Sequence, residues 1–424
     1  MASDVYIYVG QHAVEHLTEY SAAFAEQRFT LISDTNTRAA LGVQIEHAFQ
    51  AAGLSFTSIV LEGEEIIADE KYLMQALIQS PPGDQIFVAI GSGTITDITR
   101  YISFRTRNPF IATPTAASVD GFISNVAPLV IKGVKDTYTA QGPIAIFADL
   151  ATMAAAPGQL SAAGFGDVLG KVTALADWQL GKLLWNEPYN AVIEQRVRHA
   201  LVTCFEAADE IARRSEQGIQ YLMDALLETG LCISDMGNSR PASGAEHHCS
   251  HYWEMQLLKE NKPAILHGSK VGYATSLITK LYDQVRALTQ DDVRRLVQDA
   301  SYAGYESEVE QIKYGYGPSA DQIIKVQRPF LDLTEAEYTQ LQQRIVDNWS
   351  TIQAIAQTVL PSSTIVELLE QVGAPTDWHS LGLEEHMVEP ALLYGHYLRN
   401  RFTVVKLCKF LGLNLRQLVR GDPA

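Results

Sequence analysis

The chain has 424 residues, of which 47% are hydrophobic, and it carries a formal net charge of −17. This length exceeds what one hydrophobic core usually supports, so the sequence predicts two domains. With 32 Lys and Arg against 49 Asp and Glu, the chain lacks the basic excess that neutralises a nucleic-acid backbone, which argues against a nucleic-acid-binding protein. The charge does not exclude a small anionic ligand, because a few local cations outweigh a distant global charge.

Cysteine usage and the start of the chain indicate the cellular compartment. The four cysteines have no metal-binding or disulfide-framework spacing, and the first residues lack a basic segment followed by an apolar run. No stretch of about 18 uninterrupted apolar residues occurs, which is the length that a membrane-spanning helix needs. We therefore expect a cytoplasmic protein without a membrane span.

The first 150 residues alternate short β-rich runs with helical patterns. Such alternation predicts parallel strands joined by crossover helices. A hairpin is expected at residues 125–138, with its turn at Lys132 and Gly133. The predicted strands cover residues 5–9, 29–34, 56–61, 85–90, 109–113 and 144–149, and the predicted helices between them cover residues 13–27, 36–52 and 70–79.

From about residue 150 onward the pattern is helical. The sequence therefore predicts an α/β domain at residues 1–155 and an all-helical domain at residues 156–424. A proline-containing segment at residues 359–364 is expected to interrupt a helix. The predicted helices include residues 191–214, 220–229, 245–260 and 270–288, with several more up to residue 418.

A glycine-containing loop, Gly91-Ser-Gly-Thr-Ile-Thr-Asp97, follows a predicted buried strand and precedes a helical pattern. Backbone amides and a helix N-terminus together bind anions, and glycine lets a pyrophosphate approach closely. The loop lacks the third glycine of the dinucleotide fingerprint and the Gly-Lys end of a P-loop. A purely structural turn is therefore an equally good interpretation of the loop alone.

Asp34 closes the second predicted strand. An acidic side chain at that place can hydrogen-bond an adenosine ribose hydroxyl and repel a 2′-phosphate, which favours NAD over NADP. Asp34 can equally cap the next helix, and the two roles can coexist. The small, hydroxyl-rich segment at residues 113–124 also follows a strand, and its composition is typical of a loop packed against a cofactor.

Imidazoles are concentrated near the middle of the chain. His247 and His251 stand four apart, so they share one face of a helix, and His267 reaches the same point if the chain turns back. Asp167, which follows a glycine in an apolar helical stretch, is the best candidate for a carboxylate ligand. Two imidazoles and one carboxylate with an open coordination position would form a Lewis-acid metal site.

Taken together, ordered sequence blocks resemble those of the sn-glycerol-1-phosphate dehydrogenase family. That family belongs to the superfamily of glycerol dehydrogenase, iron-type alcohol dehydrogenases and dehydroquinate synthase. With Asp34, the matching positions run from about residue 30 to residue 270, and the last 150 or so residues carry no assigned motif. The blocks are Gly91 to Asp97, Pro114-Thr-Ala-Ala-Ser-Val-Asp-Gly121, Gly166-Asp167, Ser239-Arg-Pro-Ala-Ser-Gly-Ala-Glu-His247 with His251, and Leu266-His-Gly268.

This resemblance implies a dehydroquinate synthase-like architecture. A Rossmann-like dinucleotide-binding domain would precede a helical metal- and substrate-binding domain, with the active site in the cleft between them. The implied reaction is the reversible reduction of dihydroxyacetone phosphate to sn-glycerol 1-phosphate by NAD(H), with NADP(H) as an alternative cofactor. One divalent metal ion, zinc or nickel, would be bound, and phospholipid biosynthesis is one expected use of the product.

The resemblance also implies roles for individual residues. Asp120 and His251 would be catalytic, and the substrate would contact both of them and Asp167. Iron-type alcohol dehydrogenases have a further histidine ligand four residues after the aspartate, where this chain has Lys171, so three ligands remain. The metal ligands would be Asp167, His247 and His267, and the dinucleotide would contact Asp34, Gly91, Gly93, Thr94, Asp97, Thr115, Ser118 and Ser124.

Several points stay open at the level of the sequence. His251 or a metal-linked water could deliver the proton, because imidazole titrates near neutral pH. A homodimer is expected from the resemblance and from the prevalence of symmetric dimers. The alternative functions are a glycerol or polyol dehydrogenase, a dehydroquinate synthase, a metal-dependent hydrolase and a non-catalytic sensor. The substrate phosphate could be bound by Lys171, Arg240, Lys270, Arg399 or Arg401.

Overall fold

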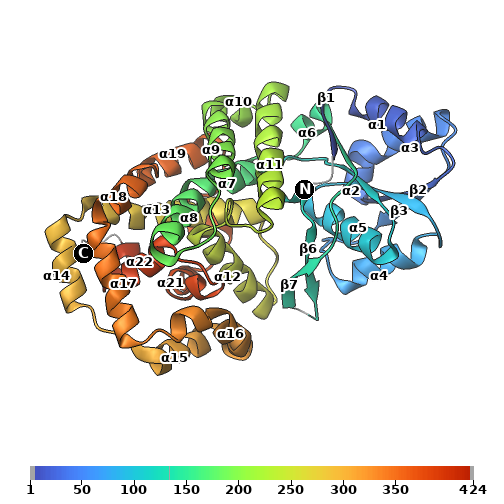
Figure 1. Ribbon diagram of the computed structural model, residues 1–424. Helices are drawn as coiled ribbons and strands as arrows, with labels where there is room; N and C mark the ends of the chain where they lie inside the picture. The colour runs from blue at the N-terminus through green and yellow to red at the C-terminus, as the bar shows by residue number, and fades with distance from the viewer. Residues whose placement is uncertain (1–4, 133, 421–424) are drawn as a thin grey trace. The chain divides into compact units, whose positions relative to one another are not determined.

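The computed structural model describes residues 5–132 and 134–420 (Figure 1). The chain divides into two compact units, and the first extends past the predicted boundary at residue 155. The predicted division into two functional domains, with a cleft between them, stays a prediction. The first unit comprises Met1–Val168, Val202–Asn238 and Gln371–Gly373, and the second comprises Leu169–Leu201, Ser239–Glu370 and Ala374–Ala424.

The first unit is built on a six-stranded parallel sheet with the strand order β1-β8-β5-β4-β2-β3. Every residue of β4 is buried, as expected for an apolar strand inside a parallel sheet that is covered on both faces. The predicted parallel α/β fold is thereby confirmed. The strands are β1 (Tyr6–Gly10), β2 (Arg28–Asp34), β3 (Phe56–Leu61), β4 (Gln85–Ile90), β5 (Phe110–Thr113) and β8 (Ala145–Asp149).

Helices cover both faces of this sheet (Figure 1). On one face, α1 and α3 pack against each other, and Leu17, Ile45 and Phe49 join the core that the strands supply. On the other face lie α4 and α5, which contact each other. These elements are α1 (Ala13–Ala22), α2 (Thr35–Thr37), the π-helical turn η1 (Arg38–Gly42), α3 (Val43–Ala51), α4 (Glu70–Gln79) and α5 (Gly93–Thr106).

The predicted hairpin is confirmed as a separate antiparallel pair, and Gly133 of its predicted turn lies outside the described residues. The strand signal ends after β8, and helices follow. The hairpin strands are β6 (Val126–Ile131) and β7 (Val134–Thr139), and the remaining elements of the first unit are η2 (Gly121–Ile123), α6 (Leu150–Ala155), α7 (Gly158–Leu169), α10 (Ala208–Ala212) and α11 (Glu216–Met236).

Among its described residues, the second unit has helices and no strands, which confirms the predicted all-helical C-terminal part. Its centre is α13, which contacts α8, α12, α18 and α22. The helices are α8 (Lys171–Trp185), α9 (Ala191–Glu206), α12 (Ala245–Lys259), α13 (His267–Ala287), α14 (Gln290–Asp299), α15 (Gly304–Tyr316), η3 (Gly317–Ser319), α16 (Ala320–Leu331), α17 (Glu335–Asp347), α18 (Trp349–Gln357), α19 (Ser362–Gln371), α20 (Trp378–Leu381), α21 (Glu385–Tyr394), η4 (Gly395–Tyr397), α22 (Val404–Phe410) and α23 (Leu415–Arg420).

One buried carboxylate, Asp177 on α8, connects the central helices of this unit. Its Oδ2 accepts the N–H of Ala245 at 2.8 Å, which caps α12. Its Oδ1 accepts the N–H of Val404 at 2.7 Å and the hydroxyl of Tyr282 at 2.6 Å, which adds α22 and α13. Burial and the nearby charge of Glu246 raise the pKa of Asp177 to about 7. The start of α12, which carries the clustered histidines, is therefore fixed from three other helices.

The segment Trp349–Gln371 is long and apolar enough to cross a membrane by length and composition alone. In the structure it forms two helices, α18 and α19, which are separated at the predicted proline-containing break. Both helices bury apolar side chains, including Ile352 and Ile365. Core helices pass the same test, so this segment is weak evidence for a membrane span.

Candidate active site

Three of the predicted cofactor-binding segments follow the carboxyl ends of neighbouring parallel strands. Asp34 ends β2, Gly91 follows β4, and residues 114–124 follow β5. The register pairs Ile90 with Thr113, and the N–H of Gly91 donates to the carbonyl of Thr113 at 3.2 Å. These segments therefore lie along one edge of the sheet, where open α/β folds bind nucleotides.

The glycine loop packs too tightly to accept a side chain at Gly91, and it leaves little room for one at Gly93. A Cβ on Gly91 would lie 2.6 Å from the Cβ of Ile95, and a Cβ on Gly93 would lie 3.3 Å from a methyl carbon of Val119. Thr94 lies in the first turn of α5. Packing thus explains Gly91 without a ligand, and it leaves the predicted cofactor contacts of this loop as predictions.

Ser92 links the glycine loop to the segment after β5. Its hydroxyl and that of Ser118 are 2.5 Å apart, and within the described residues its side chain makes no capping hydrogen bond to α5. Thr115, in the same segment, is buried. The side chain of Ser92 therefore does not cap the first N–H groups of α5. A helix N-terminus that binds an anion needs such N–H groups for the ligand.

Asp97 forms an ion pair with Arg100, whose side chain is almost completely buried. The guanidinium of Arg100 also donates to the carbonyl of Gly121 at 2.6 Å, so it ties α5 to the segment that carries Asp120. Burial lowers the pKa of Arg100, and the charge of Asp97 opposes that effect. The hydroxyl of Ser124 is engaged within its own turn.

The structure places Asp34 at the N-terminus of α2. Its Oδ1 accepts the N–H of Thr37 at 2.8 Å, and the hydroxyl of Thr37 accepts the N–H of Asp34 at 3.0 Å. This reciprocal arrangement is a capping box. The capping role of Asp34 is therefore present, and its predicted contact with a ribose stays a prediction.

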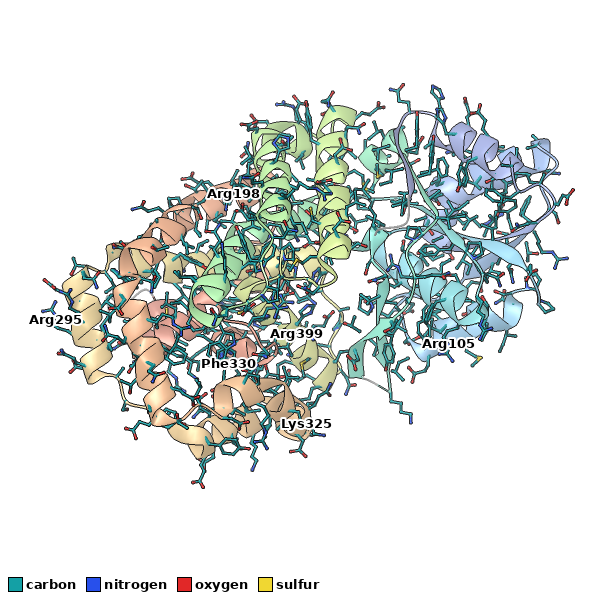
Figure 2. The ribbon with its side chains drawn as sticks, in the orientation of Figure 1. Arg105, Arg198, Arg295, Lys325, Phe330 and Arg399 are labelled. Atoms are coloured by element: carbon teal, nitrogen blue, oxygen red, sulfur yellow. The ribbon has the colours of Figure 1, made fainter. Side chains whose placement is uncertain are left out.

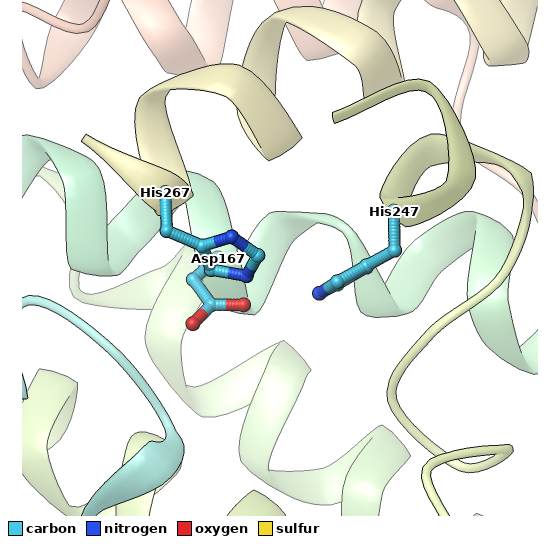
Figure 3. A group of neighbouring side chains, drawn as sticks. All are labelled: Asp167, His247 and His267. Carbon is cyan, nitrogen blue, oxygen red and sulfur yellow. The ribbon is translucent and has the colours of Figure 1, made fainter. Parts of the chain in front are cut away.

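The three predicted metal ligands come together. One ligand atom of each of Asp167, His247 and His267 lies within 4.8 Å of the other two (Figure 3). Asp167 and His247 are buried, and His267 is partly exposed. They belong to α7, the first turn of α12 and the first residue of α13. Two imidazoles and one carboxylate are donors that zinc and nickel both accept, so this set fits a divalent metal ion.

Asp167 is also connected to the segment after β5. Its Oδ2 accepts the backbone N–H of Asp120 at 3.1 Å. On the same helix, a Cβ on Gly164 would lie 2.0 Å from the carbonyl oxygen of Ala117. The absence of a side chain at Gly164 therefore lets α7 approach the backbone of the loop that carries Asp120.

His251 lies beside the three-residue group and is not one of its members. Its ring centroid is 6.2 Å from that of His247 and 5.5 Å from that of His267. Its Nδ1 is 3.6 Å from a carboxylate oxygen of Glu254, and the other oxygen of Glu254 is 3.2 Å from the amine of Lys270. This position agrees with a role next to the predicted metal ligands, and the substrate contact also stays a prediction.

The cations proposed for the substrate phosphate differ in their surroundings. Arg401 donates to the carbonyl of Ser243 and to the hydroxyl of Ser239 at 2.8 Å, so it fixes the segment that precedes α12. Burial, together with the charges of Arg240 and Arg399, lowers the pKa of Arg401 to about 10. Arg240 donates to Glu187 at 2.7 Å. Arg401 therefore has a structural role in its present contacts.

Glu246 is a functional candidate that sequence reasoning did not single out. Its side chain is fully buried, and its Oε1 lies 2.8 Å from the Nδ1 of His247. Burial alone would raise the pKa of Glu246, but hydrogen bonds with His247, Thr173 and the N–H of Gly244 outweigh burial and lower that pKa. The sequence does place an acidic residue directly before the predicted ligand His247. Adjacent side chains on a helix point in different directions, so this position did not predict a contact between the two.

Comparison with known proteins gives a consistent result. Residues 8–157 match the family model for iron-containing alcohol dehydrogenase. The fold is similar to that of sulfoacetaldehyde reductase from Bifidobacterium kashiwanohense in complex with NAD⁺, with a TM-score of 0.63, 16% identity and coverage of 99% of this chain and 98% of that chain. At this identity the likeness establishes the fold alone.

Two relatives are similar over almost the whole chain, and both are named glycerol-1-phosphate dehydrogenase [NAD(P)+]. The protein from Geobacillus stearothermophilus is 36% identical, over 94% of this chain and 90% of its own length. The protein from Halalkalibacterium halodurans is 37% identical, with the same two coverages. These similarities extend into the last 150 residues, where the sequence alone offered no motif. The chain belongs to the glycerol-1-phosphate dehydrogenase family.

Proposed function

We propose that this protein interconverts dihydroxyacetone phosphate and sn-glycerol 1-phosphate, using NAD(H) or NADP(H) and one divalent metal ion. Relatives named for this activity match nearly the whole chain. The observation that carries the proposal in the structure is the convergence of one ligand atom each from Asp167, His247 and His267. A hydrolase would not need the glycine loop and capped strand end that suit a dinucleotide.

Asp167, His247 and His267 are the proposed metal ligands. These residues would hold a metal ion that supplies a Lewis acid for the ketone oxygen, and the dinucleotide would supply the hydride for the adjacent carbon. Two hydrogen bonds support this arrangement: the N–H of Asp120 donates to Asp167, and a buried bond from Ala245 to Asp177 fixes the start of α12. A preorganised site of this kind favours the charge that develops on the substrate oxygen.

The proposed dinucleotide site follows the edge of the sheet. Its members are Asp34, Gly91, Gly93, Thr94, Asp97, Thr115, Ser118 and Ser124. The N-terminus of α5, which Ser92 does not cap among the described residues, suits the pyrophosphate. Asp34 suits the adenosine ribose and favours NAD, although its present hydrogen bonds belong to a helix cap.

Asp120 and His251 are the proposed catalytic residues, and both contact the substrate in this proposal. His251 would hold or deliver the proton for the substrate oxygen, since imidazole titrates near neutral pH. Glu254 lies close to both His251 and Lys270, so it links the proposed proton donor to a buried cation. The remaining candidates for binding the phosphate are Lys171, Lys270, Arg240 and the exposed Arg399, which is labelled in Figure 2.

The proposal includes a cytoplasmic homodimer. Symmetric dimers are the commonest form of soluble oligomers, and the four cysteines lack the spacing of a disulfide framework. Light scattering coupled to gel filtration measures the mass directly. A mass of one chain at working concentration would exclude the dimer without affecting the proposed reaction.

Substrate choice tests the proposed activity. Loss of NADH absorbance is followed on adding dihydroxyacetone phosphate, with dihydroxyacetone in parallel and with chelator-treated protein resupplied with zinc or nickel. Turnover that requires the phosphate, disappears on chelation and returns with one metal supports the proposal, and chiral analysis then identifies the product. Turnover of the unphosphorylated ketone alone would indicate a polyol dehydrogenase, and no oxidation with any metal would favour a dehydroquinate synthase-like enzyme.

A further inference from the structure

Glu246 lies immediately before a proposed metal ligand and is completely buried. Its Oε1 accepts the backbone N–H of Gly244 at 2.7 Å and lies 2.8 Å from the Nδ1 of His247. Its Oε2 accepts the hydroxyl of Thr173, on α8, at 2.6 Å. Two groups, the N–H of Gly244 before α12 and the hydroxyl of Thr173 on α8, therefore hold the carboxylate against one ring nitrogen of His247.

This contact determines which nitrogen of His247 carries a proton. A carboxylate only accepts hydrogen bonds, so the Nδ1 of His247 must be the donor. In a neutral imidazole the other nitrogen, Nε2, is then unprotonated and has a lone pair for a metal ion. In Figure 3 the ring of His247 is turned toward Asp167 and His267, as a ligand that binds through Nε2 requires.

Contacts at the start of α12 explain Glu246 only in part, since its Oε1 accepts the N–H of Gly244, the residue that precedes the helix. The N–H of Ala245 at the helix start is already accepted by Asp177. Burying a second carboxylate beside Asp177 is unfavourable, since the charge of Glu246 contributes to the raised pKa of Asp177. A second buried carboxylate at this place therefore needs a reason beyond contacts at the helix start. Its contact with the ring of His247 is that reason.

We propose that Glu246 is a positioning residue that holds His247 in the tautomer with Nδ1 protonated and aims its Nε2 at the metal ion. An outer carboxylate of this kind fixes the orientation of a ligating histidine and raises its basicity. Thr173 and Gly244 in turn hold the carboxylate in place. The inference rests on the proposed role of His247 as a metal ligand.

The first test needs no metal, and it uses a variant only to assign the signals. Long-range ¹H–¹⁵N correlation spectra of the metal-free protein, labelled at histidine nitrogens, report the tautomer of each ring, and His247→Ala identifies the signals of His247. The expected result is a protonated Nδ1 and an unprotonated Nε2. A His247 ring with its proton on Nε2 would overturn the inference.

Two substitutions then separate positioning from mere packing. Glu246→Ala removes the acceptor, so the Nε2-protonated tautomer should appear and affinity for Zn²⁺, measured by competition with a chromophoric chelator, should fall by roughly 10- to 100-fold. Glu246→Gln retains an oxygen for the Nδ1 proton and can donate to Thr173, so it should restore the tautomer and most of the lost affinity. Equal affinity in the wild-type protein and Glu246→Ala would contradict the proposal.

A matched control and a milder variant keep the result interpretable. Glu308→Ala removes a largely buried carboxylate that pairs with Lys409 in the same unit, so it should lower stability and leave Zn²⁺ affinity unchanged. If Glu246→Ala fails to fold, Thr173→Val frees Oε2 alone and should lower affinity by a smaller factor; unchanged affinity would then count against the inference. If His247→Ala retains full metal affinity, the proposed metal site itself is wrong. If His247→Ala loses metal affinity but Glu246→Ala does not, only the proposed role of Glu246 is wrong.

Discussion

The backbone N–H of Asp120 donates a hydrogen bond to Oδ2 of Asp167 over 3.1 Å. One contact thus joins a loop at the edge of the parallel sheet to the carboxylate proposed to bind the metal ion. Asp167 is fully buried, so its orientation depends on such contacts. The proposed substrate residue and the proposed ligand are therefore positioned together.

Asp167→Asn tests the charge at this point. The amide oxygen can still accept the N–H of Asp120, but a neutral ligand binds a divalent cation more weakly than a carboxylate does. Affinity for Zn²⁺ should fall by more than about 100-fold, beyond the loss typical of an outer-shell partner. Chelator competition measures that affinity, and circular dichroism verifies the fold. Wild-type affinity in a folded Asp167→Asn protein would remove Asp167 from the ligand set.

Gly164→Ala tests the close approach of α7 to the loop after β5. The new Cβ would lie 2.0 Å from the carbonyl oxygen of Ala117, so the backbone must shift. Urea unfolding should show a loss of about 1–3 kcal/mol, the usual effect of overpacking, and NADH titration should show weaker binding. Gly158→Ala, on the same helix, meets Arg214 only at 3.6 Å and is the control, which should be neutral or stabilising. Equal stability of the two variants would contradict this packing argument.

Asp34→Ser separates the two roles of Asp34. Serine caps helices about as well as aspartate, so stability should change by less than about 0.5 kcal/mol. Loss of the carboxylate removes both a ribose contact and the repulsion of a 2′-phosphate. The ratio of kcat/KM for NADPH to that for NADH should therefore rise roughly tenfold, equivalent to about 1.4 kcal/mol. An unchanged ratio would leave Asp34 as a helix cap only.

Lys406 predicts a pH dependence of stability. Burial, with the charge of Lys409, lowers its pKa to about 7. Its amine contacts Gln327, the carbonyl of His396 and the ring of Phe330, which is labelled in Figure 2. Above pH 7, Lys406 has released its proton in the folded protein, whereas in the unfolded chain Lys406 keeps its proton up to the higher, ordinary pKa of lysine. The contribution of this group to stability is therefore lowest below pH 7 and rises with pH.

The matching measurement is urea unfolding of Lys406→Met and of wild-type protein. Between about pH 7 and pH 9 the wild-type protein should gain stability relative to Lys406→Met by about 1 kcal/mol per pH unit. Lys325→Met changes an exposed lysine on the helix that carries Gln327, and it should show no such gain. Parallel stability curves for wild-type and Lys406→Met would mean that Lys406 stays charged in the folded protein.

Much of the fold could be predicted because its signals are local. The strand at Phe56–Leu61 and the helix at Glu70–Gln79 have the predicted bounds, since period and flanking turn residues define both. The first helix ends at Ala22, earlier than predicted, in turns that the apolar pattern does not mark. The helix at Glu216–Met236 begins earlier than predicted because Ser215 caps it. Boundaries that depend on caps were therefore the less certain part.

The candidate site divides in the same way. The convergence of Asp167, His247 and His267 could be predicted because ordered motifs carry them, and their role as ligands stays a prediction. Asp177 could not, because its hydrogen bonds reach residues 68 and 227 positions away in the chain. Glu246 was missed for a different reason. A helix turns by about 100° per residue, so adjacent side chains are not expected to meet, yet its carboxylate bends back to the ring of His247.

The most direct test of the central claim compares metal content and turnover in the same preparations of wild-type protein and His247→Ala. Both are loaded with Zn²⁺ or Ni²⁺, freed of excess metal, and assayed for NADH oxidation with dihydroxyacetone phosphate. We expect one metal ion per wild-type chain, and we expect a folded His247→Ala protein to lose the metal and the activity together. A His247→Ala protein that keeps full activity, or a wild-type enzyme that turns over without metal, would contradict the account.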